Sequence, residues 1–306
     1  MKKVVCIGEM LIDMVDVDHK GLLLAQNFEL NPGGASANVA IACARLSTET
    51  YYLGALGNDS FGKRLRNVLE DNKVNVDFVD HIGNTTIAWV GLDDDGERSF
   101  EFLRGSDGKY EIKKSALDII DENTIVHFGS ATALLGDELE KSYDTLKDKT
   151  IEVQGTVVFD PNYRELLVND VESYRNKTIN YIEVSDYVKL SLEELELISE
   201  EKDIEAAINK VSHIMKKSAV LFVTLGSKGC YVISEEISKI VPSIEITQVD
   251  ATGAGDAFIG ALISQLAKGE TDLEIAVRYA NRAGAITATH VGAINSLPTE
   301  KELQSN

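Results

Sequence analysis

Segments with the composition of β-strands alternate with segments that have the pattern of α-helices along most of this 306-residue chain. Runs rich in Val, Ile, Tyr and Phe predict strands at residues 4–8, 50–56, 125–128, 156–160, 187–190, 221–225 and 231–234. Apolar residues at helical spacing predict helices at residues 36–46, 60–71, 138–147, 192–200, 204–217, 254–268 and 273–289. This alternation predicts one α/β domain over residues 1–306, in which crossover helices cover both faces of a mostly parallel sheet.

Two segments, residues 10–32 and 84–106, break this alternation. Residues 85–103 have the pattern of two strands joined by Asp93-Asp94-Asp95-Gly96-Glu97, which is typical of a hairpin turn. Residues 22–30 add a further strand-like run. No helical pattern covers these strands, so we expect them to form a small sheet apart from the main body. Such a sheet can serve as a lid, as a dimer surface, or as both.

Charge and cysteine content narrow the classes of partner and compartment. The formal net charge of −20 repels nucleic acid and anionic membranes, so neither is expected as a partner. No run is apolar and long enough to span a bilayer, and the N-terminal apolar run predicts a first strand because polar residues soon interrupt it. The cysteines have neither metal-ligand nor redox spacing, which predicts free thiols in a reducing cytoplasm (Cys6, Cys43 and Cys230).

A glycine-bearing stretch, Gln248-Val249-Asp250-Ala251-Thr252-Gly253-Ala254-Gly255-Asp256-Ala257-Phe258, joins a strand-like run at residues 244–249 to a predicted helix. Gly253 and Gly255 allow a tight turn and leave N–H groups uncovered at the helix N-terminus. That terminus carries partial positive charge, so it predicts an anion site. Asp256 either caps the helix or acts as a base beside a reacting anion; the stretch alone favours capping.

A second glycine-bearing loop, Asn31-Pro32-Gly33-Gly34-Ala35-Ser36-Ala37-Asn38, opens another predicted helix. The glycine pair lets the backbone approach a ligand closely, and Asn38 offers an amide from the first turn. A tight loop with close helix packing is the alternative interpretation. The loop is not a Walker loop, since no Gly-Lys-Ser/Thr follows, and it lacks the G-x-G-x-x-G dinucleotide fingerprint.

Polar residues follow several predicted strands, where ligands bind in open α/β sheets. Each also has a structural interpretation as a turn, a helix start or a solvated helix face. These residues are Glu9 and Asp13 after the first strand, residues 160–164, Glu193 and Glu194, and residues 224–229.

Taken together, the two glycine loops resemble the signatures of the ribokinase-like (pfkB) family of carbohydrate kinases. Gly33-Gly34 with Asn38 is similar to the N-terminal signature, and residues 250–258 match the C-terminal signature nearly residue for residue. The resemblance covers essentially the whole chain and is greatest to bacterial fructokinases. It implies a three-layer α/β fold with a small β-sheet lid, residues 10–32 and 84–106, and ATP-dependent phosphorylation of a sugar hydroxyl.

The resemblance also implies roles for individual residues. Asp256 would accept the hydroxyl proton, and the N–H groups of Gly253, Ala254 and Gly255 would bind the γ-phosphoryl oxygens. The residues that would hold the sugar are Asp13, Gly33, Gly34, Asn38, Arg104, Arg164 and Asp256. Those that would bind ATP are Asn162, Lys189, Thr224, Gly226, Gly229, Gly253, Gly255 and Asn281.

Metal ions enter through the same resemblance. Glu194 matches the glutamate of the family's Asn-x-x-Glu motif and would hold Mg²⁺ through water, although Ser191 replaces the asparagine. Many members also bind K⁺ beside the anion site, and an ion-free helix end and loop is the alternative here. The matching positions, some through backbone carbonyls, are Asp250, Thr252, Thr287, His290, Gly292 and Ser296.

The acceptor sugar is less constrained than the reaction. Residues 160–164 and 189–194 are similar to those of bacterial fructokinases and of 2-keto-3-deoxygluconate kinases, and Ser106-Asp107 favours the fructokinase pattern. We therefore expect D-fructose, phosphorylated to fructose 6-phosphate, with the keto-acid sugar next and ribose or a nucleoside behind. We also expect a homodimer through the lid.

Two alternatives come from other functional classes. A catalytically silent sensor of sugar or nucleotide could use the same fold, but the intact Asp256 and its glycine loop argue against it. An NAD-dependent oxidoreductase is suggested only by the alternation and the glycine loops, and the missing dinucleotide fingerprint argues against it.

Overall fold

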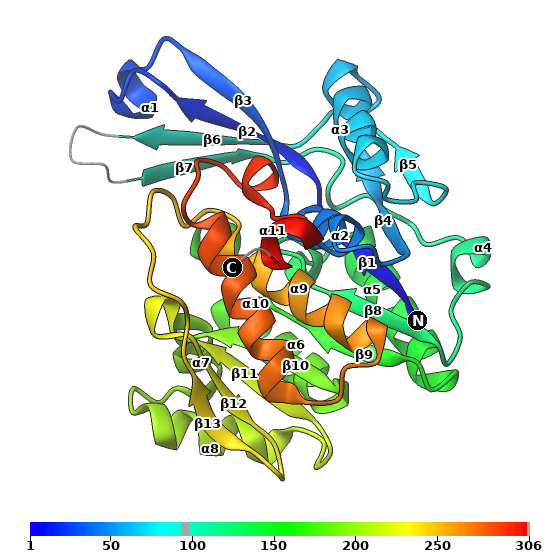
Figure 1. The fold of residues 1–306 in the computed structure, drawn as a ribbon. Coiled ribbons are helices and arrows are strands. Elements are labelled where there is room, and N and C mark those ends of the chain that lie inside the picture. Colours follow the sequence, from blue (N-terminus) through cyan, green and yellow to red (C-terminus); the bar gives the residue numbers. More distant parts are fainter. Residues whose placement is uncertain (93–97, 305–306) are drawn as a thin grey trace.

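The computed structural model describes residues 1–92 and 98–304, and a nine-stranded sheet forms the centre of its main body (Figure 1). The strand order is β13-β12-β11-β10-β9-β8-β1-β4-β5. All neighbours from β11 to β5 pair in parallel, and β12 and β13 add an antiparallel edge. The strands are β1 (Lys3–Ile7), β4 (Thr50–Leu56), β5 (Val79–His81), β8 (Thr124–Phe128), β9 (Thr156–Phe159), β10 (Tyr187–Ser191), β11 (Val220–Thr224), β12 (Cys230–Ile233) and β13 (Ser238–Val241).

Helices cover both faces of this sheet, so the main body has three layers (Figure 1). On one face, α2 (Ala35–Arg45), α9 (Ala254–Lys268) and α10 (Leu273–Thr287) share an apolar core with strand residues such as Cys6. The opposite core contains Ile7 and is covered by α5 (Glu138–Glu152), α6 (Val171–Val184), α7 (Leu192–Ser199) and α8 (Ile204–Ile214). Successive strand residues enter different cores because side chains alternate between the faces of a sheet.

The remaining helical elements are short or peripheral. They are α1 (Gly21–Leu24), α3 (Ser60–Asp71), α4 (Lys114–Leu117), α11 (Glu300–Gln304), and the 3₁₀ turns η1 (Ala133–Leu135), η2 (Glu165–Leu167), η3 (Gly226–Lys228) and η4 (Ile294–Ser296). Within the described part of the chain, no helix is both long and apolar enough to cross a membrane.

A second, four-stranded sheet projects from the main body at the upper left of Figure 1. Its order is β3-β2-β6-β7, with β2 (Leu11–Asp16), β3 (Phe28–Gly33), β6 (Ile87–Leu92) and β7 (Arg98–Leu103). β2 pairs antiparallel with β3 and parallel with β6, and β6 pairs antiparallel with β7. The predicted hairpin turn at residues 93–97 lies outside the described residues.

Two local predictions are wrong. Residues 244–249 form no strand, because β13 already occupies the sheet edge and ends at Val241, which leaves no neighbouring strand to pair with. Ile244, Ile246 and Val249 are accordingly exposed. Residues 22–30 are not one strand either, since α1 includes residues 21–24 and β3 begins only at Phe28. The sequence pattern also missed α6, β5 and β13, whose stability comes from packing and pairing with distant segments.

Candidate active site

The N-terminus of α9 depends on a glycine. Gly253 precedes the helix in a left-handed conformation with φ of 78°. A Cβ atom there would lie 2.8 Å from the Cβ of Ala293, so a side chain would be strained by the backbone and blocked by its neighbour. The first N–H groups of a helix have no intrahelical acceptor, so this turn offers donors and partial positive charge near the carboxyl ends of the strands. One of them, the N–H of Ala254, donates to the Ala251 carbonyl at 3.1 Å.

Asp256 lies in the first turn of α9 but does not cap it. The cap residue is Gly253, and among the described residues no side chain caps this helix. The Asp256 carboxylate instead accepts a hydrogen bond of 2.8 Å from Nδ2 of Asn38 on α2. Burial raises the pKa of Asp256, while this hydrogen bond and the charge of Lys189 oppose the rise. The carboxylate is thus oriented from another helix, and its raised pKa suits a proton acceptor.

The second glycine loop brings Asn38 into place. Gly34 precedes α2 with φ of 112°, and a Cβ atom there would lie 2.6 Å from the carbonyl oxygen of Glu9. A side chain at Gly33 would collide with Oδ2 of Asp13 on β2. The glycine pair therefore lets β2, the loop and α2 meet. Through this contact and the Asn38–Asp256 hydrogen bond, the structure gathers the predicted sugar-binding residues Asp13, Gly33, Gly34 and Asn38 near Asp256.

Glu9 binds the backbone where this loop enters α2, a role that was not predicted from the sequence. The side chain is 1% exposed, and Oε1 accepts the N–H of Ala35 at 2.8 Å. Oε2 accepts a hydrogen bond from the Ser130 hydroxyl. Burial raises the pKa of Glu9 to about 7. The carboxyl group thus supplies the helix-start acceptor that Gly34 lacks, and the only signal in the sequence is a glutamate directly after the first strand.

Lys189 and Asp160 form a buried ion pair beside α9. Nζ of Lys189 lies 3.1 Å from Oδ1 of Asp160, and the two side chains are 7% and 0% exposed. A Cβ atom at Gly255 would lie 3.5 Å from this Nζ, which places the ammonium next to the first turn of α9. Burial disfavours the charged form, but the carboxylates of Asp160, Glu194 and Asp256 raise the pKa of Lys189 overall. The ammonium therefore stays protonated.

Glu194, the predicted Mg²⁺ residue, holds two backbone groups. Oε1 accepts the N–H of Tyr163 at 3.0 Å, and Oε2 accepts the N–H of Ser191 at 2.7 Å. Ser191 Oγ accepts the N–H of Glu194 in return, which completes a capping box at α7.

These residues fit Mg²⁺ only as a water-mediated ion. Among the residues that the structure describes, no group of three or more His, Cys, Asp and Glu could hold a metal ion. Oδ2 of Asp160 is buried without a hydrogen-bond partner in that same part of the chain, and Asp160 lies within electrostatic range of Glu194. Mg²⁺ takes oxygen ligands and keeps much of its water shell, so this donor set suits an ion held through water.

The other predicted nucleotide residues lie at the carboxyl ends of the strands or on α10. Thr224 ends β11, and Gly226 and Gly229 follow with φ of 59° and 102°. Asn162 has φ of 48° and donates from Nδ2 to the Gly129 carbonyl at 3.4 Å. Asn281 on α10 donates from Nδ2 to the Val241 carbonyl at 2.9 Å, so its amide group is held by the end of β13.

The two arginines predicted to face the sugar have different surroundings. Arg104 donates to Asp107 from Nε and Nη2 at 2.8 and 2.6 Å, and its Nη2 also lies 2.6 Å from Asp137. Two carboxylates on one guanidinium leave this group with a net negative charge. Arg164 donates from Nη1 to the Tyr163 carbonyl at 2.9 Å, and its positive charge partly offsets the rise that burial causes in the pKa of Asp256.

A cavity of about 590 Å³ lies between β7, η2 and α6. Its lining includes Phe100, Phe102, Arg104 and Tyr174, but neither Asp256 nor Asn38. The cavity therefore adjoins the small sheet and is separate from the point where the two glycine loops meet.

The predicted K⁺ positions lie on two adjoining segments behind α9. Asp250 accepts the N–H and the hydroxyl of Thr252 at 3.0 and 2.7 Å, and its other oxygen accepts the N–H of Gly292 at 3.0 Å. Thr287 donates to the carbonyl oxygen of Ser296 at 3.3 Å. The His290 ring contacts the Thr289 hydroxyl. The structure thus brings residues 250–252 and 287–296 together, with His290 oriented toward its own helix end.

Comparison with known proteins agrees with this geometry. Residues 1–300 match the sequence profile described as the pfkB family carbohydrate kinase. The chain is 38% identical to Fructokinase-1 of Oryza sativa subsp. japonica, over 98% of this chain and 96% of that protein. The chain belongs to the pfkB family of carbohydrate kinases.

Solved structures resemble this pfkB kinase over nearly its whole length. The fructokinase of Vibrio cholerae O395 in its fructose, ADP and calcium ion bound form has a TM-score of 0.87 and 29% identity, covering 99% of this chain and 98% of that chain. The aminoimidazole riboside kinase of Salmonella enterica, complexed with aminoimidazole riboside and an ATP analog, has a TM-score of 0.86 and 27% identity, covering 98% of each chain. The predicted three-layer ribokinase-like fold with a small separate sheet is confirmed.

Proposed function

We propose that this kinase transfers the γ-phosphoryl group of ATP to D-fructose and forms fructose 6-phosphate. The observation that carries the proposal is the Asn38–Asp256 hydrogen bond, because it joins the two glycine loops at one carboxylate. The curated rice relative is a fructokinase, and the Vibrio cholerae structure contains fructose and ADP, which supports fructose as the acceptor.

In this proposal Asp256 is the general base. Its carboxylate accepts the proton of the sugar hydroxyl while the hydroxyl oxygen attacks the γ-phosphorus, and the bond to the oxygen bridging the β- and γ-phosphorus atoms breaks to release ADP. Asn38 keeps the carboxylate in one orientation by donating to Oδ2. Such base catalysis typically contributes about 10²–10⁴-fold to the rate.

The N-terminus of α9 acts as the anion hole for the transferred group. The N–H groups of Gly253 and Gly255 donate to the γ-phosphoryl oxygens, and the N–H of Ala254 joins them by exchanging the Ala251 carbonyl for the anion. The helix dipole favours the negative charge of these oxygens. Asn162, Lys189, Thr224, Gly226, Gly229 and Asn281 complete the ATP site. Donors from the backbone and a paired lysine allow an anionic ligand to bind although the chain carries a net charge of −20.

The charge around Arg104 favours a neutral sugar over a keto-acid sugar. Because Arg104 is already bound by Asp107 and Asp137, a substrate carboxylate would approach two carboxylates on a single cation. Hydroxyl groups of fructose need only acceptors and donors of the kind that Asp13, Asn38 and the Gly33–Gly34 backbone provide. Arg164 then contacts sugar or phosphate near Asp256.

We propose Mg²⁺ as the ion that accompanies ATP, held through water by Glu194 and Asp160. When bound, it neutralises charge on the phosphates. We also propose K⁺ as an ion between residues 250–252 and 287–296. The hydrogen bonds that Asp250 accepts from the N–H groups of Thr252 and Gly292 support this site, because they join the two segments next to the N-terminal end of α9.

The exposed apolar side chains on and near the small sheet support a homodimer through this lid. Leu23 and Leu24 on α1 and Leu103 at the end of β7 are 94%, 64% and 60% exposed. Analytical ultracentrifugation of the wild type and of Leu23→Lys tests the dimer; a monomeric wild type rejects it.

The free and buried cysteines support a reducing cytoplasm as the compartment.

One assay tests the acceptor. ADP release from MgATP is measured with fructose, 2-keto-3-deoxygluconate, ribose, glucose and adenosine, and kcat/KM is compared across the panel. The proposal expects fructose to have the highest value. A higher value for another acceptor would reject fructose but keep the kinase, and ADP release with none of the acceptors would support a sensor.

A further inference from the structure

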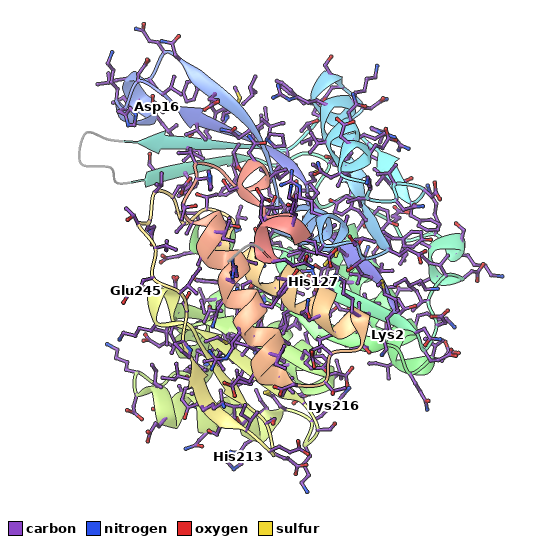
Figure 2. The ribbon with its side chains drawn as sticks, in the orientation of Figure 1. Lys2, Asp16, His127, His213, Lys216 and Glu245 are labelled. Carbon is purple, nitrogen blue, oxygen red and sulfur yellow. The ribbon has the colours of Figure 1, made fainter. Side chains whose placement is uncertain are left out.

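His127 is a buried imidazole on the same face of the sheet as α9. It lies on β8, opposite Cys6 of β1 and Val158 of β9, and Figure 2 shows it in the centre of the view, within the main body. The side chain has no exposed surface. Among the residues that the structure describes, neither ring nitrogen has a hydrogen-bond partner. Unpartnered buried polar atoms cost free energy and are uncommon in native proteins.

The ring leans toward the carboxyl end of β8. A Cβ atom at Gly129 would overlap the imidazole, so the missing side chain at this position makes room for the ring. Burial and the nearby charge of Lys189 lower the pKa of His127 to about 3. The imidazole is therefore neutral, with one N–H donor and one acceptor.

Asp160 directly follows the end of the next strand, β9. The N–H of Asp160 donates to the Phe128 carbonyl at 3.0 Å and extends the β8–β9 ladder, which places Asp160 next to Gly129. Asp160 is two residues after Val158, so both side chains are on the α9 face. Oδ1 holds Lys189, whereas the buried Oδ2 has no partner in the described residues. Three unpartnered polar atoms thus lie on the α9 face of the sheet, two on His127 of β8 and one on Asp160 just past the end of β9.

A role in stability alone does not explain this arrangement. Replacing a buried ion pair by apolar groups of similar size is often neutral or stabilising, so such a pair is weak support for the fold. The pair nevertheless places one cation next to Gly255 in the first turn of α9, where the anion hole is proposed. Lysine has a long flexible stem, so its charge stays at one point only when other groups hold it.

We propose that Asp160 and His127 are positioning residues that hold the Lys189 ammonium beneath the first turn of α9, where it adds a fixed positive charge to the anion hole. Asp160 holds the ammonium directly. His127 makes no direct hydrogen bond to Asp160, and it acts on the carboxylate through a water molecule between its ring and the unpartnered Oδ2. The inference rests on the proposed phosphoryl transfer, which it extends to the residues behind the anion hole.

The ion pair is tested with Lys189→Met, Asp160→Asn and the double variant. We expect Lys189→Met to lower kcat by about 10²–10³-fold, as for loss of one preorganised charge-stabilising group, and Asp160→Asn to lower it by about 10–100-fold. The KM for the best acceptor sugar should stay within about threefold. Each single variant leaves the charge of the other residue buried and unpaired, and the double variant removes both charges. The melting temperature of the double variant should therefore return toward that of the wild type, while its kcat stays at the Lys189→Met level.

Nucleotide binding without sugar supplies a second readout. Measured by calorimetry, the affinity for a non-hydrolysable ATP analogue should fall about tenfold in Lys189→Met, because the proposed cation faces the γ-phosphoryl group. The affinity for ADP should fall by less than about threefold. Equal losses for both nucleotides would overturn the placement of the charge. Recovery of kcat in the double variant would overturn it as well, because the pair would then serve only the fold.

His127 is tested with His127→Phe and His127→Gln. The first keeps the ring volume and removes the polar atoms, and should lower kcat by about tenfold; the second keeps a donor and an acceptor and should recover most of that loss. Ile125→Val, on the same strand and face, is the matched core control, with full kcat and a melting temperature lower by about 1–3 °C. Equal kcat for the Phe and Gln variants would overturn the role of His127.

Two further results separate this inference from related ideas. If Asp160→Asn raises the Mg²⁺ concentration needed for half-maximal rate by more than tenfold while analogue binding and kcat at saturating Mg²⁺ are unchanged, Asp160 acts only on the metal and the positioning role fails. If the wild type phosphorylates none of the sugars, the proposed function fails, and the ratio of analogue to ADP affinity still tests the placement of Lys189.

Discussion

The variant Asp256→Asn tests catalysis separately from binding, because it replaces one carboxylate oxygen by an amide NH₂ group and changes nothing else in the chain. The substitution keeps the size of the side chain, and the new amide oxygen can still accept the hydrogen bond that Asn38 Nδ2 now donates to Oδ2 at 2.8 Å. It removes the capacity to accept a proton from the sugar hydroxyl. The backbone N–H groups of Gly253 and Gly255 are unchanged, so the anion hole remains.

The expected magnitudes follow from these contacts. Loss of a general base lowers kcat by about 10²–10⁴-fold, equivalent to roughly 2.7–5.4 kcal/mol of activation free energy, and the KM values for ATP and sugar should change by less than about threefold. The stability of the fold should not fall together with kcat. An acid whose pKa is raised by folding stabilises the fold below its unfolded pKa and loses that contribution as pH rises through its folded pKa. Because burial raises the pKa of Asp256, the variant should be as stable as the wild type or more stable at pH 7.

Three measurements on one preparation test this reasoning. ADP release with saturating sugar gives kcat, calorimetry gives the affinity for ATP, and thermal unfolding at pH 7 gives the melting temperature. Asp203→Asn is the matched control, because Asp203 caps the remote helix α8 and asparagine caps equally well. A kcat within tenfold of the wild type would refute the base assignment, and a lower melting temperature would refute the argument from burial.

Three more predictions concern other parts of the site. Gly34→Ala should lower sugar affinity at least tenfold and destabilise the protein by about 1–3 kcal/mol, because φ is 112° and the new Cβ would meet the Glu9 carbonyl oxygen; sugar KM and urea unfolding measure both effects. Glu9→Gln should flatten the pH dependence of stability, because the Glu9 carboxyl has a pKa of about 7 in the folded state against an ordinary value of 4.5. The wild type should therefore lose roughly 1.4 kcal/mol per pH unit relative to this variant between those two values and nothing further above them. Turnover should be faster in K⁺ than in tetramethylammonium at equal ionic strength, and Asp250→Asn should reduce that difference.

Each of these outcomes has a contrary result. Unchanged sugar affinity in Gly34→Ala would mean that the loop can move the new Cβ away from the Glu9 carbonyl oxygen without disturbing the sugar site. Parallel pH profiles for the wild type and Glu9→Gln would place the titration elsewhere. Equal rates in both cations would leave residues 250–252 and 287–296 as an ion-free loop.

Local chemistry made the fold and the two glycine loops predictable. The alternation of strand and helix patterns is a property of neighbouring residues, and so are the turns at Gly34 and Gly253 that only glycine tolerates. The wrong strand at residues 244–249 has alternating apolar residues as well, but a strand needs a free neighbour, and β13 had already taken the sheet edge. Helix α6 was missed although Asp170 caps it through the N–H of Ser173, because its interior pattern is weakly apolar.

The groups behind the site could not be predicted in the same way. His127 is on β8, Asp160 directly follows β9 and Lys189 is on β10. The Asp160–Lys189 ion pair and its position relative to His127 depend on these three strands being adjacent and in register. The partnership of Glu9 with Ser130 likewise follows from the adjacency of β1 and β8. Periodicity within one segment contains no information on which strands are neighbours.

The hydrogen bond between Asn38 and Asp256 connects residues 218 positions apart, and this separation has a consequence during synthesis. At about 5–20 residues per second, roughly 10–40 s pass between the translation of one and the other. Throughout that time α2 lacks the helix that covers it, since Gly260 of α9 packs against Ala42 and accepts a hydrogen bond from Cys43. The nascent chain therefore carries an uncovered apolar helix and an incomplete site, and it is most prone to misassociation in the interval before α9 leaves the ribosome.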